Sequence, residues 1–293
     1  MNTQNTHPSS CHTHHQNTAH TDQNAPNTDI VWQHIRDEVV LQVQKEPILA
    51  SFLYASILNH DSLEKALSFH LANILDSAQC PAITLREIFC EALSHTPSIA
   101  AATRRDIIAC IERDPVCTEY SIPFLYYKGF HAFQGYRIAH WLWQRHRQSL
   151  AFFLQNRIST ILGVDIHPAA HIGSGILVDH ATGIVIGETA VIEDDVSILH
   201  GVTLGGTGKE IGDRHPKVRK GVLLSAHATL LGNIEIGTGA KVAAGSVVLQ
   251  HVPPHTTVAG IPAKAVGSPK EAQPAFSMDH QFNAINATSE EAD

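Results

Sequence analysis

Large aliphatic side chains recur every six residues through the second half of the chain. A second apolar track, mostly of smaller side chains, lies two residues before each of them. Residues two apart on a β-strand point to the same face, so each unit supplies two inward side chains. This pattern predicts the stacked coils of a hexapeptide β-helix, which share one core. The large positions are Ile186, Ile192, Ile198, Leu204, Leu224, Leu230, Ile236, Val242 and Val248, and the second track holds Ile184, Ala190, Val196, Val202, Val222, Ala228, Ile234, Ala240 and the polar Ser246.

The longest interruption of this pattern predicts a loop that leaves the β-helix. Leu204 and Leu224 lie 20 residues apart, where six would continue the repeat, so we expect an extra loop at about 207–221. Insertions in repeat proteins form surface loops, often on the binding face. Five cations against two anions give this loop a local charge of +3, which favours an anionic ligand. Arg214 and His215 are neighbours within it.

A shorter irregularity upstream brings a histidine next to a carboxylate. Ile172 and Ile186 lie 14 residues apart instead of 12, and Asp179 and His180 fall between them. A histidine beside an acid in an irregular segment is a candidate general base. The alternative is a corner histidine that only caps the backbone, and the chain holds 21 histidines. The position of His180 favours the catalytic interpretation.

Residues 29–162 follow a helical pattern and predict an all-α domain ahead of the β-helix. Thr84 and Glu87 have the spacing of a capping box, which predicts a helix beginning there. A further helix should open at Pro97 and stop before Pro115.

Composition limits the classes of function and the compartment. A net charge of −8 disfavours general nucleic-acid binding, and no stretch approaches the roughly 18–20 apolar residues of a membrane span. Five sparse cysteines and the lack of a secretory leader pattern predict a cytoplasmic protein without a disulfide framework. Residues 1–28 are polar and His-rich and should be disordered, although a metal-binding tail is the alternative. Residues 268–293 should form a flexible tail.

Several segments together resemble bacterial serine O-acetyltransferases over about residues 30–285. The hexapeptide pattern alone indicates only a large superfamily of acyltransferases, whereas the helical region and the two irregular segments narrow it. The segments are IERDPVC (111–117), LYYKGFHAFQGYRIAHWLW (125–143), VDIHPAAHIG (164–173), DHATGIVIGETAVIEDDVSIL (179–199), VTLGGTGK (202–209), GDRHPKVRKGV (212–222) and LGNIEIGTGAKVAAGSVVLQHVPPHTTVAGIPA (231–263).

The resemblance implies a fold and an activity. The fold is α+β, with an N-terminal all-α domain (29–162) followed by a left-handed parallel β-helix at 163–267. The activity is transfer of acetyl from acetyl-CoA to the hydroxyl of L-serine, which gives O-acetyl-L-serine, the precursor of cysteine. The resemblance implies no metal. The chain has no need of a cysteine as acyl carrier, so we expect direct transfer in a ternary complex.

A serine hydroxyl is a weak nucleophile and needs a base as it attacks a thioester. His180 is the candidate, and the resemblance pairs it with Asp165, which would orient the ring. The oxyanion donor stays open between His215 and a backbone amide of the glycine-rich strand end.

The amino-acid substrate also needs partners for its two charges. The resemblance assigns the ammonium to Asp114 and Asp179, and the carboxylate to Arg214 and His215. Arginine's planar fork suits a carboxylate. The plainer alternatives are that Asp114 is a turn residue before a proline and that Arg214 is a solvated loop charge.

The CoA path is implied by four positions. Gly206 and Thr207 lie in a glycine-rich run that lacks the helix signal of a P-loop, so we expect it to border the pantetheine arm. Ala226 and Lys241 match family positions near the same path.

The resemblance also implies partners. It predicts a trimer, joined to a second trimer through the helical domains, with L-cysteine as feedback inhibitor. Relatives bind cysteine synthase through a C-terminal isoleucine. SMDHQFNAIN (277–286) resembles the family tail, but Asp293 stands where that isoleucine is expected, so cysteine synthase stays an open partner.

Three other interpretations remain open at this point. One is an acetyltransferase that acts on a sugar hydroxyl. A second is a β-helical zinc lyase with His171, His180 and His200 as ligands, although their spacings of 9 and 20 are not whole coils. The third is a scaffold without activity.

Overall fold

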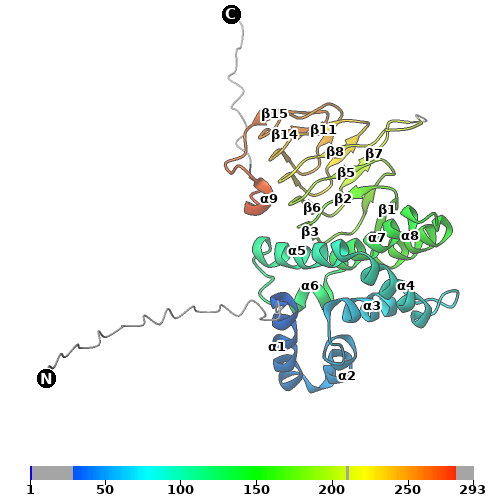
Figure 1. Cartoon of the computed structure of the whole chain (residues 1–293). Helices are drawn as coiled ribbons and strands as arrows, with labels where there is room; N and C mark the ends of the chain where they lie inside the picture. Colours follow the sequence, from blue (N-terminus) through cyan, green and yellow to red (C-terminus); the bar gives the residue numbers. More distant parts are fainter. Residues whose placement is uncertain (2–28, 209–210, 282–293) are drawn as a thin grey trace, which may run out of the picture.

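The computed structural model describes residues 29–208 and 211–281, together with Met1. Helices come first and a parallel β-helix follows, as Figure 1 shows. The helical region holds α1 (Ile30–Lys45), the 3₁₀ turn η1 (Pro47–Leu49), α2 (Ala50–Leu53), the π-helical turn η2 (Tyr54–Leu58), α3 (Leu63–Ile74), α4 (Ala82–His95), α5 (Pro97–Arg113), α6 (Ser121–Tyr126), α7 (Lys128–Gln144) and α8 (Gln148–Leu162).

Local capping sets where several of these helices begin. Pro97 opens α5, and the helix ends at Arg113, as the sequence predicted. The predicted capping box at Thr84 and Glu87 is wrong, because α4 already begins at Ala82 and Thr84 lies in its first turn. The Asp76 carboxylate accepts a hydrogen bond from the Ala82 amide at 2.6 Å, so a residue six positions earlier satisfies this helix end.

Three sheets wind into the β-helix. The five-stranded sheet has the order β1-β4-β7-β10-β13, the four-stranded sheet β11-β8-β5-β2, and the six-stranded sheet β15-β14-β12-β9-β6-β3. All pairs are parallel except β14 with β15. The strands are β1 (Val164–Ile166), β2 (His171–Ile172), β3 (Leu177–Asp179), β4 (Ile184–Ile186), β5 (Val191–Ile192), β6 (Ser197–Leu199), β7 (Thr203–Gly205), β8 (Lys217–Val218), β9 (Leu223–Leu224), β10 (Thr229–Leu231), β11 (Glu235–Ile236), β12 (Lys241–Val242), β13 (Val247–Val248), β14 (Thr257–Gly260) and β15 (Ala263–Gly267).

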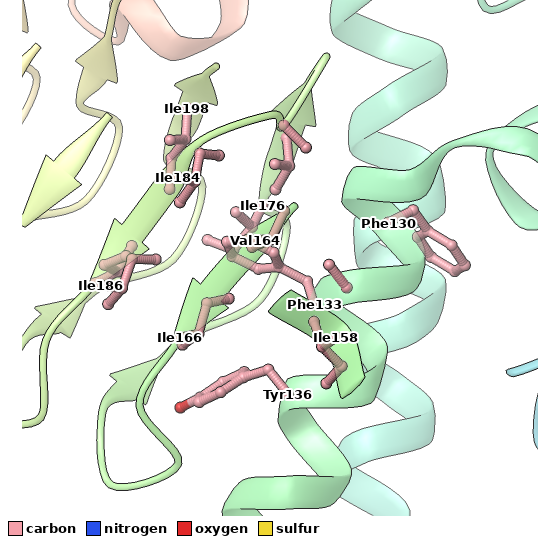
Figure 2. Packing of buried hydrophobic residues seen from close by; sticks show 14 of the residues in the cluster. Phe130, Phe133, Tyr136, Ile158, Val164, Ile166, Ile176, Ile184, Ile186 and Ile198 are labelled. Atoms are coloured by element: carbon pink, nitrogen blue, oxygen red, sulfur yellow. The ribbon is translucent and has the colours of Figure 1, made fainter. Parts of the chain in front are cut away.

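The six-residue pattern describes the core correctly. All nine large positions are at most 2% exposed, and the second track is at most 7% exposed. Figure 2 shows Ile184 and Ile186 on strand β4 and Ile198 on strand β6 of another sheet, all in this core. The predicted fold class, a helical region followed by a parallel β-helix, is therefore confirmed.

The inserted loop is shorter than the sequence suggested. Strand β8 lies inside the segment expected to form the loop, and it pairs with β5 and β11. Val218 is fully buried, but Pro216 takes the second-track position before it and hides the repeat. The excursion thus runs between β7 and β8.

A buried polar cluster joins the helices to the first coils. Asp106 on α5 accepts hydrogen bonds from Gln134 (2.9 Å) and Arg137 (2.7 Å) on α7, and from the backbone amide of Ile176 (2.9 Å). Asp106 is only 2% exposed, so its charge depends on these partners. Apolar packing surrounds the cluster: Figure 2 shows Phe133, Tyr136 and Ile158 beside the first strand.

Part of the expected flexible tail packs on the β-helix. Helix α9 (Pro274–Ser277) lies within it, and the carbonyl of Ala275 accepts a hydrogen bond from Ser197 at 2.8 Å. The guanidinium of Arg113 lies 4.1 Å from the centre of the Phe276 ring. The predicted disorder of residues 2–28 and the end at Asp293 fall outside the described residues. Within the described part, no helix is long and apolar enough to cross a membrane.

Candidate active site

His180 lies at a corner of the β-helix, between β3 and β4. Its φ is 56° and that of Ala181 is 61°, so two successive non-glycine residues are left-handed. The backbone turns tightly here, since the Ala181 amide donates to Asp179 O (2.6 Å) and the Thr182 amide to His180 O (2.7 Å). The His180 side chain is 73% exposed, and its Nε2 lies 3.7 Å from Asp179 Oδ2. This corner presents an imidazole to solvent on a constrained backbone.

Asp114 faces the same corner from the end of α5. Its Oδ1 accepts a hydrogen bond from the Val116 amide (3.0 Å), and its Oδ2 accepts one from the Tyr127 hydroxyl (2.8 Å). Burial and the adjacent Asp114 raise the pKa of Tyr127, so the phenol stays protonated and remains a donor. Asp114, Asp179 and His180 line one cavity of about 600 Å³.

Two lining residues of this cavity were not predicted from the sequence. Tyr127 holds Asp114, and Lys128 donates a hydrogen bond to the Thr182 hydroxyl two residues after His180. Both lie at the start of α7, within the aromatic run that the sequence analysis treated only as packing and resemblance. Their position at the start of a helix, Tyr127 as its N-cap and Lys128 as its first residue, is the signal that could have pointed to them.

Asp165 is placed differently from the predicted pairing. It lies on β1, is half-buried, and accepts a hydrogen bond from Gln155 Nε2 at 2.7 Å. Among the described residues, the carboxylate within 4.0 Å of the His180 ring nitrogen is that of Asp179. The pairing of Asp165 with His180 therefore stays a prediction.

Arg214 and His215 lie beside the turn between β4 and β5. Arg214 Nη2 donates to Glu188 Oε2 at 2.6 Å, which lowers the pKa of that carboxyl. His215 is only 7% exposed, and its ring packs so closely on Gly187 that a β-carbon there would overlap it. Burial, and then the charge of Arg214, lower the pKa of His215. The ring is therefore neutral at neutral pH.

The tautomer of His215 follows from its neighbour Thr189. The Thr189 amide donates to His215 Nδ1 at 3.2 Å, and an amide N–H can only donate. Nδ1 of the neutral ring must then be the acceptor, and Nε2 carries the proton. Nε2 is 3.6 Å from the position that a β-carbon on Gly206 would take, on the loop side of the ring. His215 can thus offer one N–H to a carboxylate or an oxyanion.

These two groups of residues occupy different corners of one chain. His180 lies where the chain passes from the six-stranded to the five-stranded sheet. His215 lies where it passes from the five-stranded to the four-stranded sheet. The structure thus brings Asp114, Asp179 and His180 together, and separately Arg214 and His215.

Comparisons with known proteins agree on one family. A family model described as "Serine acetyltransferase, N-terminal" matches residues 31–135. The serine acetyltransferase of Escherichia coli (strain K12) is 57% identical over 265 residues, which cover 90% of this chain and 97% of that protein. The chain belongs to the serine acetyltransferase family.

Solved structures support the same assignment. A serine acetyltransferase from Vibrio cholerae O1 biovar El Tor N16961 has 60% identity and a TM-score of 0.86, and the match covers 86% of this chain and 98% of that one. A serine acetyltransferase in complex with cysteine has 58% identity and a TM-score of 0.85, with 86% and 98% covered. The chain is thus an acyltransferase with acetyl-CoA as donor and serine as acceptor.

The residues expected along the CoA path of this acetyltransferase also divide between the corners. Gly206 and Thr207 follow β7, and Gly206 lies beside Arg214. Ala226 follows β9, on the sheet that carries His180. Lys241, on β12 of that sheet, is 3% exposed and donates a hydrogen bond to the carbonyl of Gln281, and burial lowers its pKa.

Family membership decides against the rival interpretations. The rings of His180 and His200 are 5.7 Å apart, but His171 lies on another sheet with its ring 5.2 Å from His140. In the described ranges, no group of three His, Cys, Asp or Glu side chains is placed to hold a metal. An acceptor other than serine finds no support in the comparisons.

Proposed function

We propose that this serine acetyltransferase makes O-acetyl-L-serine in a site shared by two copies of the chain, with His180 as general base. The observation that supports this is the separation of His180 and His215 on different corners of one β-helix. In the described part of the base corner the cation is Lys128, which is engaged by the Thr182 hydroxyl, so no arginine fork faces the substrate carboxylate there. In the corner with Arg214, the acceptor nitrogen of His215 is already engaged by Thr189, so this ring is not free to act as base. Side-by-side packing of two β-helices joins the halves.

The chemistry follows from the two halves. Asp114 and Asp179 hold the serine ammonium, and Arg214 holds its carboxylate. His180 removes the hydroxyl proton as the serine oxygen attacks the thioester carbon of acetyl-CoA. The N–H of His215 binds the substrate carboxylate or the oxyanion that forms. When the intermediate collapses, the C–S bond breaks and the CoA thiolate takes the proton from His180. Asp165 orients the imidazole in this scheme.

Two corners of different character on one prism also specify the assembly. The contact is heterologous, because one corner meets a different corner of the neighbour, and such contacts form a ring when the rotation between neighbours closes. A trimer lets each three-cornered prism use two corners, and a second trimer can join through the helical regions. Gly206 and Thr207 from one chain, with Ala226 and Lys241 from the next, then border a single CoA path. A serine acetyltransferase similar to this chain has been solved with coenzyme A, and another with serine.

A subunit-mixing experiment tests the shared site. His180→Ala and Arg214→Ala chains with different tags are co-expressed, and mixed oligomers are isolated by both tags. A shared site pairs an intact base corner with an intact carboxylate corner in about one quarter of randomly formed contacts, so about a quarter of wild-type activity returns. Mixed oligomers of two differently tagged His180→Ala chains are the control and stay inactive. No recovery in the first mixture means that each chain builds its site alone.

The serine half of the site has its own test. Asp114→Asn should raise the KM for serine by about tenfold or more, with a smaller change in kcat, because it removes one charge facing the ammonium. An unchanged serine KM removes Asp114 from the site.

L-cysteine is proposed as an inhibitor of the same site. It differs from serine only in its thiol, so Asp114 and Arg214 can hold its charged groups equally well. A serine acetyltransferase similar to this chain has been solved in complex with cysteine. Inhibition should be competitive with serine, and Asp114→Asn should weaken the binding of both serine and cysteine.

The cysteines at positions 80, 90, 110 and 117 are free, which supports a reducing compartment such as the cytoplasm.

A further inference from the structure

Among the described residues of one chain, few contacts hold the ring of His180. Its side chain is 73% exposed, and the nearest carboxylate, that of Asp179, lies 3.7 Å away, beyond a normal hydrogen bond. The left-handed backbone at His180 and Ala181 fixes where the side chain starts but not where the ring points. A general base must meet its proton within a narrow range of positions, so further contacts that limit the ring, besides the one proposed for Asp165, contribute to the chemistry.

The next coil places a second histidine directly beside it. Strands β3 and β6 pair in register up to Asp179 and Leu199, so His180 and His200 are the next residues on adjacent strands. Parallel strands lie about 4.8 Å apart, which brings two such side chains into contact. The ring centres are 5.7 Å apart, and the rings are inclined at 74°, an edge-to-face arrangement.

A third ring supports His200 from the far side. The ring of His227 lies 4.9 Å from that of His200, at 87°, and the His227 amide donates to His200 O at 2.9 Å. His227 is left-handed (φ 58°), which turns its ring back towards the preceding coil. Gly201 provides the space for the His227 ring, because a β-carbon at position 201 would overlap it.

Packing, rather than hydrogen bonding, holds His200 in this column. Its Nδ1 is buried and has no hydrogen-bond partner among the residues that the structure describes. The ring is thus fixed by the rings on either side. A planar ring without nitrogens should be able to do the same work.

We propose that His200, supported by His227, is a positioning residue that holds the His180 ring in the orientation for proton transfer. The inference rests on the proposed role of His180 as general base. It assigns to His200 no contact with the substrate and no proton transfer. Loss of the His200 ring should therefore slow the chemical step while serine and acetyl-CoA still bind.

The test compares His200→Ala with His200→Phe in steady-state assays of thiol release from acetyl-CoA. His200→Ala should lower kcat by about tenfold and leave the KM for serine within about twofold. His200→Phe keeps a planar ring and should retain kcat within about twofold of wild type. His227→Ala should lower kcat by about two- to threefold, because it removes the second ring only.

Controls separate this role from a purely structural one. His255→Ala removes another left-handed, exposed histidine outside the column and should leave kcat unchanged. Unfolding midpoints and oligomer size are measured for every variant, and kcat is expressed per folded chain. A His200→Ala enzyme with wild-type kcat overturns the proposal, and so does a His200→Phe enzyme as slow as His200→Ala, which would indicate a role for the nitrogens.

Wild type and His180→Ala are assayed in parallel. If wild type acetylates serine, His180→Ala is impaired and His200→Ala is not, only the positioning role fails. If His180→Ala keeps full activity, the proposed base itself is wrong, and the positioning role falls with it.

Discussion

The two corners of the β-helix hold their histidines in opposite ways. His180 is exposed on a strained, left-handed turn, and its ring depends on neighbouring rings. His215 is buried, fills the space over Gly187 and has its tautomer set by Thr189. A general base has to reach a hydroxyl proton and give it back. A receptor for a fixed anion works best when its donor is already in place. The left-handed backbone turn exposes the His180 ring, whereas close packing on Gly187 buries the His215 ring.

Replacing the exposed histidine should have the largest effect. His180→Ala should lower kcat by at least about 10²-fold, because it removes the general base. Since the side chain is mostly exposed, the unfolding midpoint should stay close to that of wild type. Steady-state kinetics and thermal unfolding on the same preparation check both parts. A large loss of stability would mean that His180 serves the fold rather than the chemistry.

Acid should destabilise the helical region most. Burial lowers the pKa of His70 to about 4 and that of His131 to about 3. Below the usual pKa of about 6.5, the unfolded chain binds protons that the folded chain does not. The free energy of unfolding therefore decreases as the pH is lowered. The loss should reach about 2 kcal/mol for each histidine at pH 5 and stop below the folded pKa values.

Denaturant unfolding between pH 8 and pH 5 measures this slope. His70→Phe should reduce this slope, since one of the two most strongly shifted histidines no longer titrates. The same replacement at the exposed His95 is the control. An unchanged slope in His70→Phe would show that other groups cause the loss of stability in acid.

Crowding the buried histidine should weaken serine binding. In Gly187→Ala the new β-carbon overlaps the His215 ring, which must move away from its fixed position. We expect the KM for serine to rise about tenfold, equivalent to about 1.4 kcal/mol, with a smaller change in kcat. Wild-type serine affinity in a folded Gly187→Ala enzyme would show that the packing around His215 is not needed.

The smallest effect is expected when the hydrogen bond from Tyr127 to Asp114 is removed. Tyr127→Phe removes the 2.8 Å hydrogen bond to Asp114 Oδ2 and leaves the ring in place. The KM for serine should rise about threefold, in line with the loss of one hydrogen bond to a carboxylate at a partly exposed site. The Tyr127→Phe, Asp114→Asn double variant should bind serine no worse than Asp114→Asn alone. Additive losses would show that Tyr127 contacts the substrate independently.

The fold could be predicted from the sequence because each coil repeats one local rule. The nine large aliphatic positions from Ile186 to Val248 recur every six residues apart from the loop, and all nine are buried. The prediction failed where the repeat contains an unusual residue. Pro216 stands at a position that is aliphatic in most other repeats, so strand β8 was not recognised and the loop was predicted too long. The helix start at Ala82 was missed because its cap, Asp76, lies outside the capping-box spacing.

The sequence by itself determined the repeat, the two irregular segments and the residue types that carry the chemistry, since these depend on local spacing and on side-chain identity. Only the tertiary structure decided which of these residues meet. Asp114 reaches His180 because α5 ends against β3, and Tyr127 reaches Asp114 because α7 begins there. His200 reaches His180 because β3 and β6 pair in register, and His227 reaches His200 from the next coil. His215 lies apart from them because a triangular coil turns the chain to another face within a few residues.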